Sequence, residues 1–237
     1  MASPADHDPQ PALTPLAPDA TFAFACHPGV PCFTECCQQL ELALSPYDVL
    51  RLKNALGLCS WEFLDRHVCV GPAAEVAFPP VYLAMRPEDG RCPFVSPKGC
   101  QVYADRPAAC RLYPVGRGTA YRDGRILRRH VLVREAHCQG FATDGRRQMD
   151  LAAWCADQGL APYERFEERT VRILQHERLR QGWRPTEKQL DTVLTALYNL
   201  DQFRIDWRAS RQSAPLPGND EDLLAFTLQW LERALFA

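Results

Sequence analysis

Residues 24–37 read FACHPGVPCFTECC. Four cysteines stand in this stretch without helix or strand periodicity, so we expect the cysteines, and not regular secondary structure, to determine how the N-terminal half of the chain folds. Three more cysteines lie within residues 92–110, and another stands at position 138. Four thiolates complete a tetrahedral zinc site or a 4Fe-4S cluster, so eight match two sites, or one closed site and one with spare ligands. The predicted metal ligands are Cys26, Cys32, Cys36, Cys37, Cys92, Cys100, Cys110 and Cys138.

Adjacent cysteines at positions 36 and 37 bear on how the ligands divide. On extended backbone, neighbouring side chains point to opposite sides, so the two thiols can serve two neighbouring centres more easily than one ion. We therefore expect a paired or bridged arrangement of metal centres.

A disulfide framework is the alternative use of eleven cysteines in 237 residues. The chain is too long to need disulfide staples, begins without a signal peptide and has an odd cysteine count, so metal binding is favoured. Outside the eight ligands stand Cys59, Cys69 and Cys155, which we expect to be small buried apolar residues.

Positive charge is expected close to the ligands. Each four-thiolate centre keeps a charge of about −2, which is costly to bury without compensation. Arg106 and Arg111 lie among the second group of cysteines, and planar guanidinium groups suit thiolate or sulfide acceptors, so both are predicted to bind the cofactor. His27 and His137 adjoin predicted ligands, and we expect supporting or surface roles for them.

Composition excludes several functional classes. A net charge of −2 with 24% charged residues does not indicate a nucleic-acid partner, and no apolar run is long enough for a membrane-spanning helix. We expect a cytoplasmic protein. Glycine-rich nucleotide-binding motifs and the common hydrolase motifs are absent from the sequence. Gln39 occupies the position where radical S-adenosylmethionine enzymes carry their third cysteine, which disfavours that chemistry.

The predicted fold class is α+β. A disordered tail is expected over residues 1–21, a cysteine-cluster metal-binding domain over 22–141, and a helical C-terminal region packed on it over 142–237. The irregular cysteine-rich half is expected to be held by its metal and to contain short helices at 45–56 and 60–67. A strand at 78–85 and a hairpin around Asp123-Gly124 predict a small antiparallel sheet.

After residue 140 the pattern becomes helical throughout. Glycines at 159 and 182 end predicted helices at 150–158 and 163–181. Thr186 and Gln189 form a capping-box pattern, and Asn219 precedes a predicted helix at 221–236.

Several short motifs together carry a family resemblance. They are Phe24, the cysteines of residues 26–37, LSPYDVLRL at 44–52, CPF at 92–94, Cys100, Tyr103, DRP at 105–107 and CRLYP at 110–114. Over residues 22 to 141 the chain resembles the YkgJ-type cysteine-cluster family, which is described as zinc- or iron-chelating.

That family includes the flagellin lysine N-methylases. The resemblance implies an iron-sulfur cluster, S-adenosylmethionine as methyl donor, and methyl transfer to a lysine of a protein substrate. The alternative is a zinc- or iron-chelating binding module without catalysis. No residue of this sequence is identified as catalytic.

Overall fold

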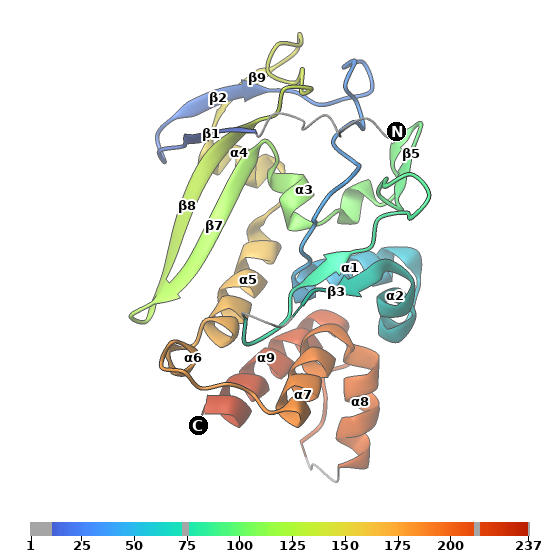
Figure 1. The fold of residues 1–237 in the computed structure, drawn as a ribbon, viewed down its shortest axis with the longest axis vertical. Coiled ribbons are helices and arrows are strands. Elements are labelled where there is room, and N and C mark those ends of the chain that lie inside the picture. The colour runs from blue at the N-terminus through green and yellow to red at the C-terminus, as the bar shows by residue number, and fades with distance from the viewer. Residues whose placement is uncertain (1–10, 73–75, 211–213, 237) are drawn as a thin grey trace, which may run out of the picture.

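The structure is a computed structural model that describes residues 11–72, 76–210 and 214–236. Its fold is α+β, as predicted, with short antiparallel sheets in the first part of the chain and helices in the last (Figure 1). None of the described helices is both long and apolar enough to cross a membrane.

A three-stranded sheet contains the longest strands. Strands β1 (Ala12–Pro15), β7 (Val115–Arg122) and β8 (Arg125–Arg134) pair antiparallel in the order β1-β8-β7. The turn between β7 and β8 has positive φ at both central residues, 52° at Asp123 and 74° at Gly124. This is the geometry that a two-residue type I′ hairpin requires, so the predicted hairpin is confirmed.

Several strands lie where the sequence predicted none, and two of them form in regions for which it predicted another structure. β1 forms within the expected disordered tail, and β9 (Arg147–Asp150) forms within the expected helical region, where it pairs with β2 (Thr21–Phe24). All four β1 side chains are exposed, so this strand has no alternating apolar pattern; its ordering comes from pairing with the edge of β8. Residues 1–10 of the predicted tail lie outside the described residues.

The metal-ligand region also contains short regular elements. Helix α1 (Pro46–Leu56) has the predicted start, a capping box of Ser45 and Asp48, and ends at Gly57. The predicted strand at 78–85 is shorter, since only β4 (Val81–Leu83) pairs, with β3 (Val68–Val70), and the two prolines at 79 and 80 precede it. The remaining elements are α2 (Ser60–His67), β5 (Val95–Ser96), β6 (Gly99–Cys100), η1 (Tyr103–Asp105) and α3 (Ala108–Leu112).

Helices make up the chain beyond β9. They are α4 (Leu151–Asp157), α5 (Ala161–Leu174), α6 (Glu177–Arg180), α7 (Glu187–Tyr198), α8 (Leu200–Ala209) and α9 (Asp220–Phe236). The capping box of Thr186 with Gln189 is confirmed. The single helix predicted at 163–181 is divided into α5 and α6, because the backbone leaves helical geometry at Gln175 and the His176 side chain caps α6.

One hydrophobic core connects both parts of the chain. Helix α1 packs against α5, α7 and α9, and Tyr47 of α1 stacks on Phe166 of α5 with ring centroids 4.5 Å apart. Trp154 of α4 is buried and donates from Nε1 to the carbonyl of Leu112, which ends α3, at 2.9 Å. The cysteine-bearing loops therefore lie against a hydrophobic core that both parts of the chain share.

Candidate metal centre

A succession of tight turns carries the first four cysteines. Backbone N–H groups bond to the carbonyl three residues earlier at Val30, Phe33, Glu35 and Cys37. Thr34 lies between Cys32 and Cys36 and has a positive φ of 72°, so the chain turns sharply there. These turns bring thiols together without a regular helix or strand.

Backbone contacts join the second group of cysteines to Cys37. The amide of Cys92 donates to the carbonyl of Cys37 at 2.8 Å, and Val95 N–H donates to the carbonyl of Cys92 at 3.2 Å. The pairing of β5 with β6 places Cys100 opposite Val95. Cys110 lies in α3, which begins at Ala108.

Four of the eight thiols line one small cavity. Its wall includes Cys26, Cys32, Cys36 and Cys138, together with Phe24, Ala25, Val30, Tyr113, His137 and Gly140. The amide of Gln139 donates to Cys32 Sγ at 3.2 Å, and Ala25 N–H donates to the carbonyl of Gly140 at 3.1 Å. The structure therefore brings Cys138, distant in sequence, to the first group.

Burial and neighbouring thiols raise the pKa of two cysteines of this cavity. Burial raises the pKa of Cys26 to about 11, and the neighbouring Cys36, Cys32 and Cys138 add to the rise. Burial also raises the pKa of Cys138, against a hydrogen bond with Tyr113 that lowers it. A bound cation would favour the thiolate forms of these side chains, because a metal takes the place of the thiol protons.

A second set of thiols consists of Cys37, Cys92, Cys100 and Cys110, and burial raises pKa values here too. Cys110 is exposed as a whole residue, but protein surrounds its thiol. Burial is the largest cause that raises the pKa of this thiol to about 12. Smaller contributions come from the charges of Cys92, Asp48, Cys100 and Cys36. Burial is also the largest cause of the raised pKa of Cys92 and of Cys100.

Cys36 and Cys37 are adjacent, and each thiol acts on the ionisation of the other. The neighbouring Cys37 thiol lowers the pKa of Cys36, and the Cys36 thiol is the largest cause of the raised pKa of Cys37. Cys36 lies in a turn and Cys37 in a bend, so the pair is not on the extended backbone that the expectation of opposite-facing side chains assumed, and that expectation stays a prediction. The two sets of thiols therefore meet at this pair.

The eight thiols are gathered but not closed around an ion. Within residues 11–72, 76–210 and 214–236, no three Cys, His, Asp or Glu side chains are close enough to hold a metal ion. The chemistry of the donor set nevertheless fits zinc or an iron-sulfur cluster, since both take four thiolates. Binding would have to draw the thiols of each set closer together.

The two predicted arginines have different surroundings. Arg106 donates from Nη1 to the carbonyl of Tyr103 at 2.7 Å and from Nη2 to Gln158 Oε1 at 2.5 Å. Burial raises the pKa of both Cys26 and Cys100, and the positive charge of Arg106 opposes that rise. Arg106 is therefore close enough to both sets of thiols to compensate their charge.

Arg111 instead holds separate backbone segments together through hydrogen bonds to their carbonyl groups. Its Nε donates to the carbonyl of Arg106 at 3.0 Å, its Nη1 to that of Gln158 at 2.9 Å, and its Nη2 to that of Ala104. All three guanidinium nitrogens thus serve main-chain acceptors. The sequence predicted that Arg111 binds the cofactor. In the structure its guanidinium instead connects the segment before α3 to the end of α4.

Sequence reasoning missed a polar group beside the cavity. The hydroxyl of Tyr113 donates to Glu135 Oε2 at 2.8 Å, and burial raises the pKa of Tyr113. His137 lines the same cavity, and its buried Nε2 has no hydrogen-bond partner among the described residues. The only sequence signal for Glu135 is its position three residues before Cys138, whose amide bonds to the Glu135 carbonyl at 3.0 Å.

The cysteines outside the two sets are less buried than expected. Cys59 and Cys69 are exposed, so the prediction of buried apolar roles is wrong for both. Cys155 is partly buried and packs against the hydrophobic core. All three are free thiols.

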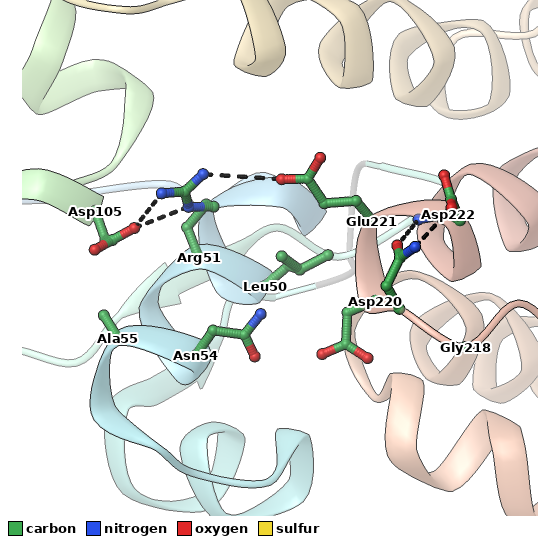
Figure 2. Close-up of a pocket in the computed structure, with 10 residues that line it drawn as sticks. Leu50, Arg51, Asn54, Ala55, Asp105, Gly218, Asp220, Glu221 and Asp222 are labelled. Carbon is green, nitrogen blue, oxygen red and sulfur yellow. Dashed lines mark hydrogen bonds and ion pairs between the residues drawn. The ribbon is translucent and has the colours of Figure 1, made fainter.

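A larger open pocket of about 840 Å³ lies between α1 and the start of α9 (Figure 2). Arg51 crosses one side of it and donates to Asp105 Oδ1 from Nε at 2.9 Å and from Nη2 at 2.5 Å, with Glu221 Oε1 3.8 Å from Nη1. Asp220 and Asp222 also line the pocket, and no cysteine does. Three of its carboxylates, those of Asp105, Asp220 and Glu221, form ion pairs, and that of Asp222 bonds to Asn219, so we do not assign the metal to it.

Comparison with known proteins agrees with the cysteine geometry. Residues 25–141 match the model of a family, CxxCxxCC, described as a putative zinc- or iron-chelating domain. The matched segment contains all eight thiols of the two sets. No curated protein matches the chain, and no solved structure matches it.

Proposed function

Residues 25–141 belong to the CxxCxxCC family of chelating domains, and from that premise we propose that this metal-binding protein holds an iron-sulfur cluster of the 4Fe-4S type. The observation that carries the proposal is the cavity lined by Cys26, Cys32, Cys36 and Cys138, beside which the amide of Cys92 bonds to the carbonyl of Cys37. Arg106 supports it, because a guanidinium near two sets of thiols can offset the charge of a buried cluster. Iron is favoured over zinc by the resemblance to the flagellin lysine N-methylases.

Zinc is the second candidate. The thiol-only donor sets suit tetrahedral Zn²⁺, and a zinc site needs no inorganic sulfide. In that case the domain is a zinc-chelating structural or binding module without catalysis.

Anaerobic purification of the full chain distinguishes the two metals. An iron-sulfur protein is expected to be brown, to absorb broadly near ~400 nm and to contain about stoichiometric acid-labile sulfide. A colourless protein that contains zinc and no sulfide would establish the alternative. The absence of both metals after anaerobic reconstitution would contradict the metal-binding function.

We further propose that the cluster supports S-adenosylmethionine-dependent N-methylation of a lysine in a protein substrate. The support is the family resemblance, together with Tyr113 and Glu135 as polar groups beside the thiol cavity. The positively charged sulfonium of S-adenosylmethionine would be attracted by the negative charge of the thiolates.

Calorimetric titration of the holo-protein with S-adenosylmethionine tests this second step. Saturable heat is expected for the wild type, and its loss is expected when Cys110→Ala removes a ligand. Cys59→Ala is the matched control, because Cys59 is an exposed thiol outside both sets. No heat from a fully loaded wild-type protein would favour the binding module.

A further inference from the structure

We infer that the eight thiols form two separate four-thiol centres that meet at the peptide bond between Cys36 and Cys37. This inference rests on the proposed metal-binding function and deepens it by assigning ligands to each centre. The first centre consists of Cys26, Cys32, Cys36 and Cys138. The second centre consists of Cys37, Cys92, Cys100 and Cys110.

The first centre is defined by a shared cavity. All four of its thiols line the same small space, and no thiol of the second centre does. Three chain segments form the wall: the end of β2 with the turns that follow it, Tyr113 at the end of α3, and the segment that follows β8. The first and the last of these carry the four cysteines. They are held together by the Ala25 N–H bond to the Gly140 carbonyl and by the edge-to-face contact of Phe24 with Phe141, whose ring centroids are 5.0 Å apart.

The second centre is assembled on different supports. The carbonyl of Cys37 accepts from the amide of Cys92, and the β5-β6 hairpin that follows carries Cys100. Gln39 N–H donates to the carbonyl of Gly90 at 2.7 Å, which holds the segment after Cys37 against the segment before Cys92. Cys110 is brought in by α3, whose first amide bonds to Asp48 of α1.

The ligand count then favours two centres. One tetrahedral ion or one four-iron cluster takes four thiolates, so eight thiols exceed the capacity of either. The two sets have separate scaffolds, one at β2 and the end of β8, the other at α1, α3 and the β5-β6 hairpin. The Cys36–Cys37 pair is the place where the chain passes from one scaffold to the other.

Cobalt(II) titration of the reduced, metal-free full chain tests the division, because thiolate-bound Co²⁺ is coloured and accepts the same tetrahedral ligands as zinc. The wild type is expected to bind two equivalents. Two double variants each remove two ligands of one centre and should each still bind one equivalent of Co²⁺. They are Cys26→Ser with Cys32→Ser, and Cys92→Ser with Cys100→Ser. The matched control is Cys59→Ser with Cys69→Ser, which removes two exposed thiols outside both sets and should leave two.

A second measurement does not depend on the folding of variants. Wild-type protein loaded with one equivalent of Co²⁺ is alkylated, and the protected cysteines are identified by tandem mass spectrometry. Protection is expected to follow the two sets, with Cys36 grouped with Cys138 and Cys37 grouped with Cys110. Saturation at one equivalent, or protection that mixes the two sets, would overturn the division while leaving metal binding intact; failure of the wild type to bind any cobalt would overturn both.

Discussion

The carboxylate of Asp48 accepts a hydrogen bond from the amide of Ala108 at 2.7 Å, across 60 positions of sequence. Asp48 is buried, and its other oxygen accepts from the amide and the hydroxyl of Ser45 at 2.8 and 2.7 Å. Burial raises the pKa of this carboxyl group, and the bonds from Ser45 and Ala108 oppose the rise. One side chain therefore caps α1 and also positions α3, which carries Cys110.

Asp48→Ala is expected to reduce both stability and metal binding. The variant leaves the Ala108 amide without its acceptor and removes the Asp48 half of the capping box, so we expect a loss of about 2 to 4 kcal/mol in the free energy of unfolding. Metal content should fall, because Cys110 loses its anchor. Chemical denaturation and metal analysis of the folded fraction measure the two effects.

Ser45→Ala is the control for this variant. It removes the hydroxyl at the helix cap, which is worth about 1 kcal/mol, and leaves the Asp48–Ala108 bond in place. Its metal content should match that of the wild type. Equal metal content in Asp48→Ala and Ser45→Ala would show that the carboxylate does not position the ligand.

Arg111→Lys should lower stability without changing metal affinity. A lysine ammonium cannot reach three carbonyls arranged around a planar guanidinium, so we expect a loss of about 1 to 3 kcal/mol in the free energy of unfolding.

Arg106→Gln removes the charge that acts on both thiol sets and should weaken metal binding per folded molecule. Thermal unfolding and cobalt competition titrations compare the two variants; weaker binding by Arg111→Lys with unchanged stability would contradict this division of roles.

Metal affinity should rise with pH. Burial raises the pKa of Cys26 to about 11 and that of Cys110 to about 12, so both thiols are protonated near neutral pH and a metal must displace their protons. Apparent affinity is then expected to fall about tenfold per pH unit for each displaced proton as pH is lowered from about 8 to about 6. Competition with a chelator of known pH dependence measures this slope, and a flat profile would mean that the thiols ionise before metal binds.

Chelation should loosen the cysteine loops but leave the helical core folded. Residues 25–39 and 86–101 are held by turns and isolated backbone bonds, whereas α1 packs on α5, α7 and α9 through apolar side chains such as Tyr47 and Phe166. Hydrogen exchange should therefore accelerate in those loops after metal removal, while far-UV circular dichroism is largely kept. Complete unfolding, or unchanged exchange in the loops, would contradict this expectation.

Local sequence determined the elements whose stabilising contacts lie within a few residues. The capping boxes of Ser45 with Asp48 and of Thr186 with Gln189, and the type I′ turn at Asp123, all depend on hydrogen bonds or φ angles inside one short segment. The number and identity of the thiols are also plain in the sequence. These features were predicted because each side chain acts on backbone close to it in the chain.

The tertiary fold was needed to bring together thiols that are distant in sequence. Cys138 lines the same cavity as Cys26 because the segment after β8 lies against the turns after β2, and the contact of Asp48 with Ala108 positions α3, which carries Cys110. The strand β1 likewise exists because β8 offers it an edge, not because of its own pattern. Such contacts join residues far apart in the chain, so their energies depend on packing that no local segment contains.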